Sequence, residues 1–184
     1  MQRTADSFKL ALGDKAPYFS LKATDSKIYS LREFADSKAL CVIFTCNHCP
    51  YAQAYEKRLI DIALAYAPKN IRFVAICSND ADGYPEDSFE RMVEKSQTLG
   101  FPFPYLHDEK QIAARAYDAA CTPEAYVFDG EQRLVYHGSI DDNHKEPAEV
   151  KAHYLRDALD AILSERQPEI PLTGCLGCSI KWKD

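Results

Sequence analysis

The chain has 184 residues, of which 46% are hydrophobic and 27% charged, a composition typical of one globular domain. Its formal net charge of −6 argues against a nucleic-acid partner, because binding to phosphates needs clustered Lys and Arg side chains. The longest apolar run, 39–44, is too short to cross a bilayer, and the first residues carry no apolar signal segment. We therefore expect a cytoplasmic protein that has no membrane partner.

The predicted elements alternate between strands and helices along the chain. Residues 13–34 are predicted to form a β-hairpin, and 38–45 is a nearly unbroken apolar run typical of a central strand buried on both faces. A helix is predicted over 50–67, because aromatic and aliphatic residues recur there at helical spacing. The later predicted elements are a strand at 71–77, a helix at 86–99, a strand at 101–106, a helix at 109–117, a hairpin with strands at 125–128 and 134–136, and a helix at 147–163.

This order of elements predicts an α/β protein with a mixed central sheet flanked by helices. The final hairpin adds antiparallel strands to a sheet whose strand–helix–strand order is otherwise typical of parallel pairing. We expect a single domain over residues 1–184, with residues 165–184 as a C-terminal tail that packs on it.

Cys46 and Cys49 form a C-x-x-C pair where the predicted central strand ends and the next helix begins. A thiolate at a helix N-terminus is stabilised by the helix dipole and by free backbone N–H groups, both of which lower its pKa. Cys46 is therefore the predicted nucleophile, and Cys49, one turn later, is the thiol that resolves a mixed disulfide. Half of a zinc site and two ordinary core cysteines are the alternatives to this redox interpretation.

Four stretches carry a resemblance to a known family: GDKAPYF at 13–19, FTCNHCPY at 44–51, CTPE at 121–124 and GCSIKWK at 177–183. The chain resembles the alkyl hydroperoxide reductase/thiol-specific antioxidant (AhpC/TSA, redoxin) branch of the thioredoxin superfamily, and within it thioredoxin-like proteins with a CNHCPYA motif. The resemblance implies a thioredoxin fold with an N-terminal β-hairpin extension. It also implies that the Thr122–Pro123 bond is cis and that Pro123 faces the dithiol, shaping the groove for a substrate disulfide.

The sequence departs from both well-known branches of that superfamily. Thioredoxins carry Trp before the first cysteine and a buried acid in the preceding strand, whereas Thr45 stands before Cys46 and 39–45 contains no acid. The proton acceptor for Cys49 is therefore left to Glu124 as the candidate. Peroxiredoxins carry P-x-x-x-T-x-x-C, and this pattern fits neither cysteine of the pair.

Two further side chains are expected to modulate the dithiol. Protonated His48 would stabilise a Cys46 thiolate, and we predict a reduction potential above thioredoxin's roughly −270 mV for that reason. Cys121 would lie close to the pair if Pro123 faces it, as a third thiol or a metal ligand. The cysteines inside apolar strands are predicted to be core residues, and these are Cys41 and Cys77.

The C-terminal tail carries a second C-x-x-C pair, Cys175 and Cys178. Three interpretations stay open: a purely structural tail, a second dithiol that exchanges with the first, and a zinc site shared by the two pairs. Ile180 and Trp182 are expected to hold the tail on the body, because burying such a side chain is worth roughly 1.5–3 kcal/mol.

These residues lead to three hypotheses about function. The first is a thiol–disulfide oxidoreductase that needs no cofactor or metal and exchanges with protein or small-molecule disulfides and an upstream thiol reductant. The second is a redoxin-type thiol peroxidase with antioxidant activity, in which peroxide oxidises Cys46 or Cys49 to a sulfenate that the other cysteine resolves. The third is a protein that binds Cu(I) or Zn through Cys46, Cys49, Cys121 and His48.

Overall fold

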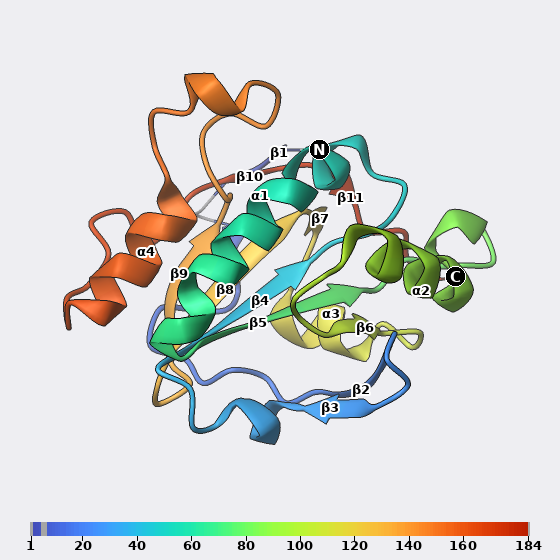
Figure 1. Ribbon diagram of the computed structural model, residues 1–184, viewed down its shortest axis with the longest axis horizontal. Coiled ribbons are helices and arrows are strands. Elements are labelled where there is room, and N and C mark those ends of the chain that lie inside the picture. The colour runs from blue at the N-terminus through green and yellow to red at the C-terminus, as the bar shows by residue number, and fades with distance from the viewer. Residues whose placement is uncertain (1, 5–6, 184) are drawn as a thin grey trace.

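The computed structural model describes residues 2–4 and 7–183, arranged around a seven-stranded sheet (Figure 1). The strands are β2 (Ser20–Ala23), β3 (Ile28–Ser30), β4 (Ala39–Phe44), β5 (Ile71–Cys77), β6 (Tyr105–His107), β8 (Glu124–Asp129) and β9 (Leu134–Gly138). They lie side by side in the order β3-β2-β6-β5-β4-β8-β9. The pairs β4–β5 and β5–β6 are parallel and the other neighbours antiparallel, so the prediction of a mixed sheet is confirmed.

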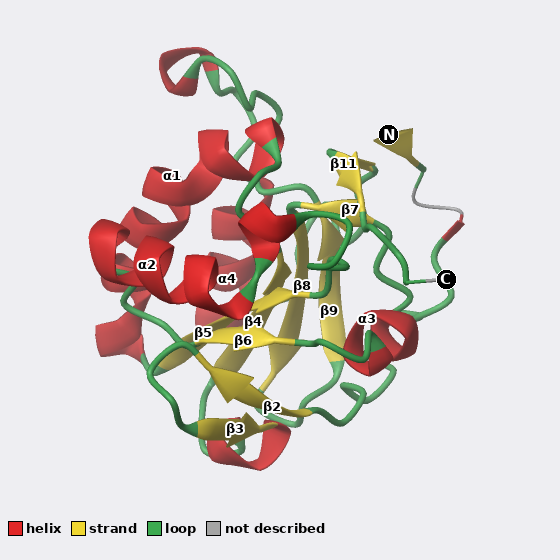
Figure 2. Cartoon of the chain, turned by 90° about the vertical axis from the view of Figure 1, so that its right-hand side faces the viewer, coloured by secondary structure: helices red, strands yellow, loops and turns green. Residues whose placement is uncertain are grey.

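Helices cover both faces of this sheet. Figure 2 shows α1 (Pro50–Tyr66), α2 (Phe89–Leu99) and α4 (Tyr154–Leu163) on one side and α3 (Ile112–Tyr117) on the other. Short 3-10 turns occupy Leu31–Phe34, Ala67–Lys69, Pro85–Asp87 and Pro147–Glu149. No helix in the described part of the chain has the length and apolar character needed to span a membrane.

Strand β4 joins two hydrophobic cores, one on each face of the sheet. All six of its residues are buried, as the continuous apolar run predicted. Leu40, Val42 and Phe44 pack in the core that includes α3 and the N-terminal hairpin. Cys41 and Ile43 alternate with them and pack in the core that includes α1 and α4. This burial on both faces fixes the end of β4, and with it the position of the C-x-x-C pair.

The tail returns over the loop between α3 and β8. Two small antiparallel pairs form there: β1 (Gln2–Arg3) with β10 (Cys175–Leu176), and β7 (Cys121–Thr122) with β11 (Cys178–Ser179). Ile180 is buried in the core, but Trp182 remains 40% exposed, so the prediction that Trp182 anchors the tail is wrong. The chain leaves the core after Ile180 because the backbone N–H of Lys181 donates to Asn79 Oδ1, 2.8 Å away.

The last helix is shorter than predicted. The helix expected over 147–163 begins only at Tyr154. Residues before it are held in an extended loop by Asp142, whose carboxylate accepts the N–H of Lys151 at 3.0 Å and whose own N–H donates to the carbonyl of Ala152 at 3.2 Å. Side-chain hydrogen bonds of this kind compete with helical ones.

Candidate active site

The C-x-x-C pair lies against the segment that precedes β8. The Thr122–Pro123 bond in that segment is cis, as the resemblance implied. Cys46 Sγ lies 3.4 Å from Thr122 Oγ1, and Cys49 Sγ lies 3.1 Å from the Thr122 carbonyl oxygen, which accepts a hydrogen bond from the protonated thiol. The structure therefore brings together both cysteines and Thr122, and the contact with the cis-proline segment runs through Thr122.

The N-terminus of helix α1 adjoins the second cysteine of the pair rather than the first. Helix α1 begins at Pro50, so that Cys49 occupies the N-cap position and Cys46 lies in the loop before it. The Cys49 side chain makes no capping hydrogen bond to the first helical turn. Stabilisation of a Cys46 thiolate by the helix N-terminus stays a prediction.

The two thiols differ strongly in acidity. The neighbouring thiols of Cys46 and Cys178 lower the pKa of Cys49 to about 4, although burial acts in the opposite direction. The pKa of Cys46 is raised by its interaction with Cys49, by burial and by the negative charge of Asp87. These shifts favour a thiolate at Cys49, and the assignment of Cys46 as the nucleophile stays a prediction.

Asp87 organises the loop that carries the dithiol, and sequence reasoning did not identify it. This fully buried carboxylate accepts the N–H groups of Asn47 and His48 at 2.6 and 3.2 Å, and the side-chain amide of Asn79 at 2.7 Å. Asp87 lies in the 3-10 turn before α2, far from the two cysteines in the sequence. Only the three-dimensional fold could reveal this contact.

His48 is held by Asp87 instead of facing the dithiol alone. Its Nδ1 lies 2.6 Å from Asp87 Oδ2, and its ring stacks on Tyr84 with centroids 5.1 Å apart. A positive charge on His48 would be balanced by this carboxylate, because opposite charges at such a distance compensate each other. A ring nitrogen of His48 and the Cys46 sulfur lie within 4.8 Å of each other, beside the Asp87 carboxylate, and the stabilisation of a Cys46 thiolate by His48 stays a prediction.

A small cavity of about 20 Å³ lies beside Cys46. Its lining includes the Tyr105 side chain and the ion pair of Glu56 with Lys95, which partly close it. The Lys95 ammonium also donates to the Asn47 carbonyl at 2.9 Å and so ties α2 to the dithiol loop. A space of this size holds about one water-sized molecule.

Cys121 and Glu124 belong to a second buried cluster. The ligand atoms of Cys121, Glu124 and Cys175 lie within 4.8 Å of one another, and all three residues are buried. Glu124 accepts the backbone N–H groups of Ala120 and Cys121 at 2.8 and 3.0 Å, and its other oxygen lies 2.7 Å from His137 Nε2. Glu124 thus holds the chain before the cis-proline, and its role as proton acceptor of Cys49 stays a prediction.

The two tail cysteines are separated. Cys178 hydrogen-bonds Cys49, whereas Cys175 joins the cluster of Cys121. The tail crosses Thr122 between them, and a Cβ atom on Gly177 would lie only 2.2 Å from the Thr122 carbonyl oxygen. The predicted Cys175–Cys178 dithiol is therefore replaced by a different grouping, because the chain is stretched over Thr122.

The proposed metal ligands are also divided. Among the described residues, Cys46 and His48 group with Asp87, while Cys121 groups with Glu124 and Cys175. The four residues expected to gather Cu(I) or Zn are therefore not brought to one place. Cys41 and Cys77, predicted to be core residues, are fully buried in β4 and β5.

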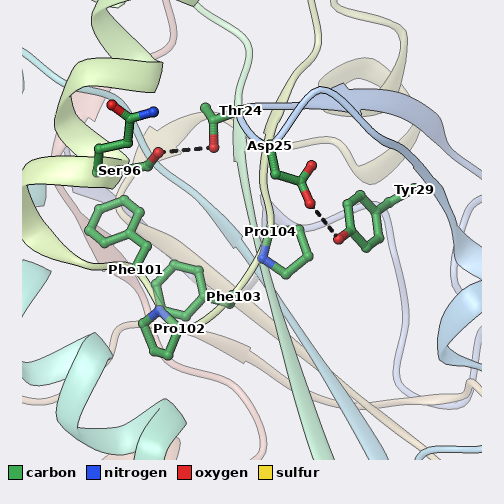
Figure 3. A pocket seen from close by; sticks show the side chains of 9 residues that line it. Thr24, Asp25, Tyr29, Ser96, Phe101, Pro102, Phe103 and Pro104 are labelled. Atoms are coloured by element: carbon green, nitrogen blue, oxygen red, sulfur yellow. Dashed lines mark hydrogen bonds between the residues drawn. The ribbon is translucent and has the colours of Figure 1, made fainter.

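An open pocket of about 420 Å³ lies between the N-terminal hairpin and α2 (Figure 3). Its polar groups already bind one another: Tyr29 donates to Asp25 at 2.8 Å and Ser96 to Thr24 at 3.0 Å. No cysteine is among the described residues that line it. This pocket offers no thiol among its described lining residues, so the dithiol remains the candidate active site.

Comparison with known proteins agrees with this site. The profile of the AhpC/TSA family matches residues 12–137. The chain belongs to the AhpC/TSA family. It is an oxidoreductase-type redoxin, and the partners of such proteins are thiols, disulfides or peroxides. No curated protein matches the chain.

Solved structures share the whole fold. An uncharacterized conserved protein from Geobacillus kaustophilus is 42% identical, with a TM-score of 0.92, covering 100% of this chain and 97% of that one. A hypothetical protein from Sinorhizobium meliloti is 39% identical, with a TM-score of 0.88, covering 95% and 96%. A thiol:disulfide interchange protein of the thioredoxin family from Chlorobium tepidum is 17% identical, with a TM-score of 0.62, covering 84% and 97%. The predicted thioredoxin fold is thereby confirmed.

Proposed function

We propose that this AhpC/TSA-family protein is a thiol–disulfide oxidoreductase in which Cys46 and Cys49 cycle between a dithiol and a disulfide. The observation that carries the proposal is the hydrogen-bonded sulfur pair held against Thr122 of the cis-proline segment. The low pKa of Cys49 supplies a thiolate at neutral pH, which is the reactive form in thiol–disulfide exchange. The cytoplasm, where thiols stay reduced, is the proposed location.

The net reaction transfers two electrons and two protons from the protein dithiol to a substrate disulfide. One protein disulfide forms, one substrate disulfide breaks, and the substrate sulfurs leave as thiols. An upstream thiol reductant then returns the protein to the dithiol state by the reverse exchange. No metal or organic cofactor takes part in these steps.

Reduction of insulin disulfides tests the proposal. Cys49→Ser should abolish turnover, because Cys46 then has no partner with which to close a disulfide within the pair. Cys41→Ala is the matched control, since Cys41 is buried in β4 on the face toward α1 and lies outside the site. Undiminished turnover in Cys49→Ser would refute the function.

Peroxide reduction is the second candidate, and the small cavity beside Cys46 favours it. Hydrogen peroxide is little larger than the single water that such a cavity holds. Cys46 would attack one peroxide oxygen and become a sulfenate while the other oxygen leaves as water, and Cys49 would then form the disulfide and release a second water. Stopped-flow peroxide consumption separates the candidates: a rate no faster than that of free cysteine excludes a peroxidase.

A further inference from the structure

We propose that Cys178 is a third redox-active thiol, at which an external disulfide first reacts before the electrons of the buried pair are used. The inference rests on the proposed oxidoreductase function and adds the point of contact with the substrate. It also gives the tail, which the Cys46–Cys49 mechanism leaves unused, a chemical role.

Exposure distinguishes Cys178 from the other cysteines. Cys46 is 2% exposed and Cys49 is 0% exposed, whereas Cys178 is partly exposed. All seven cysteines lie within the described residues, and Cys178 is the only one of them that is not buried. A disulfide whose sulfurs carry large groups therefore meets Cys178 before it meets either member of the pair.

Backbone pairing holds Cys178 against the pair. In the β11–β7 ladder Cys178 lies opposite Thr122, whose hydroxyl and carbonyl contact Cys46 and Cys49. The close approach at Gly177 keeps the tail tight against this strand. Cys178 also packs against the buried cluster that contains Cys46 and Cys49, so its sulfur lies beside the pair.

This arrangement permits a balanced sequence of exchanges. Cys178 gives its proton to solvent and attacks the substrate disulfide, forming a mixed disulfide, and the first substrate sulfur leaves and takes up a proton from solvent. The Cys49 thiolate attacks Cys178 Sγ, and the second substrate sulfur leaves as a thiolate that solvent protonates. Cys46 then attacks Cys49 Sγ and releases Cys178 as a thiol, its proton passing to Cys178. The protein ends with the Cys46–Cys49 disulfide, and no outside oxidant is needed.

Trapping the first adduct tests the proposal without any turnover. In Cys49→Ala the resolving step is blocked, so brief reaction with Ellman's aromatic disulfide should leave the thionitrobenzoate group on Cys178, as peptide mass spectrometry would show. An adduct on Cys46 with Cys178 unmodified would overturn the proposal.

The rate of insulin reduction provides a second test of the role of Cys178. Cys178→Ser should slow insulin reduction roughly ten-fold or more, because the substrate must then react with a buried sulfur. Ser179→Ala, which changes the neighbouring residue of the same strand, should react as the wild type does. Oxidation by diamide should still form the Cys46–Cys49 disulfide in Cys178→Ser, which shows that the pair is intact.

The outcomes separate the two proposals. Wild-type rates in Cys178→Ser, alongside an inactive Cys49→Ser, would refute the role of Cys178 and leave the oxidoreductase function standing. A wild-type protein that reduces no disulfide would refute the function, and the adduct in Cys49→Ala would still decide whether Cys178 is the first thiol to react.

Discussion

At the scale of single residues, the buried carboxylate of Asp87 opposes ionisation of Cys46. Replacing it by Asn removes the negative charge, so we expect the pKa of Cys46 to fall by about one unit, the usual effect of a nearby charge. The rate of Cys46 alkylation against pH, measured by mass spectrometry in a Cys49→Ala background, checks this.

Glu86→Gln provides the control for that measurement. Glu86 precedes Asp87 in the chain, but its side chain is exposed, and solvent screens its charge. Replacing Glu86 should leave the pH dependence of Cys46 alkylation unchanged. If the pH midpoint of Cys46 alkylation in Asp87→Asn equals or exceeds the midpoint in the Cys49→Ala protein that keeps Asp87, the assigned role of the carboxylate is contradicted.

At the scale of elements, the contact of β11 with β7 depends on the missing side chain of Gly177. Gly177→Ala would force its Cβ into the Thr122 carbonyl oxygen, so we expect a loss of roughly 1–3 kcal/mol in the free energy of unfolding. Gly83→Ala is the comparison, because its Cβ would meet only the flexible Asp80 side chain, at 3.2 Å. Urea denaturation of both variants measures the difference, and equal stabilities would show that the strand contact is loose.

The tail as an element is held by Ile180 rather than by the only tryptophan. Ile180 is buried and its N–H donates to the Ala120 carbonyl at 3.0 Å, so Ile180→Ala should cost roughly 2–5 kcal/mol. Trp182 is exposed and stacks with Arg115 at 4.6 Å, a contact worth about 1 kcal/mol or less. Denaturation curves that rank Trp182→Ala as the more damaging change would reverse this assignment.

At the scale of the whole molecule, the acidity of Cys49 links stability to pH. The pKa of Cys49 is about 4 in the reduced fold and about 8.5 for a cysteine in an unfolded chain, so between these values the unfolded state binds the additional proton. The stability of the reduced protein relative to Cys49→Ala should therefore rise with pH through this window and be lost as the pH falls toward 4.

Urea denaturation of both reduced proteins at several pH values measures this difference. Titrating groups that are far from Cys49 cancel, because they are common to both chains and do not interact with the replaced side chain. A difference that is independent of pH, or that falls between these two pKa values, would show that Cys49 is protonated in the fold.

The local parts of this architecture could be predicted from the sequence, and the long-range parts could not. The apolar run ending at Phe44 predicted the buried strand, and the Cys46–Cys49 spacing predicted the sulfur pair. Asp87 escaped, because its hydrogen bonds to Asn47 and His48 cross 40 and 39 residues of chain and depend on where the turn before α2 lies. Cys178 was recognised as one half of a tail C-x-x-C pair, but its packing against the first pair depends on the path of the tail.

The strand that covers the dithiol is only two residues long, Cys178–Ser179, and it pairs with an equally short partner. Such a pairing opens and closes far more readily than the central sheet, because few hydrogen bonds must break. Reagents that are too large to pass the closed tail will reach Cys46 at a rate set by this local opening. They will do so even at denaturant concentrations well below the one that unfolds the domain. Amide hydrogen exchange should accordingly be fast at Ser179 and slow in β4, and the same fluctuation would admit bulky partners to the buried sulfurs.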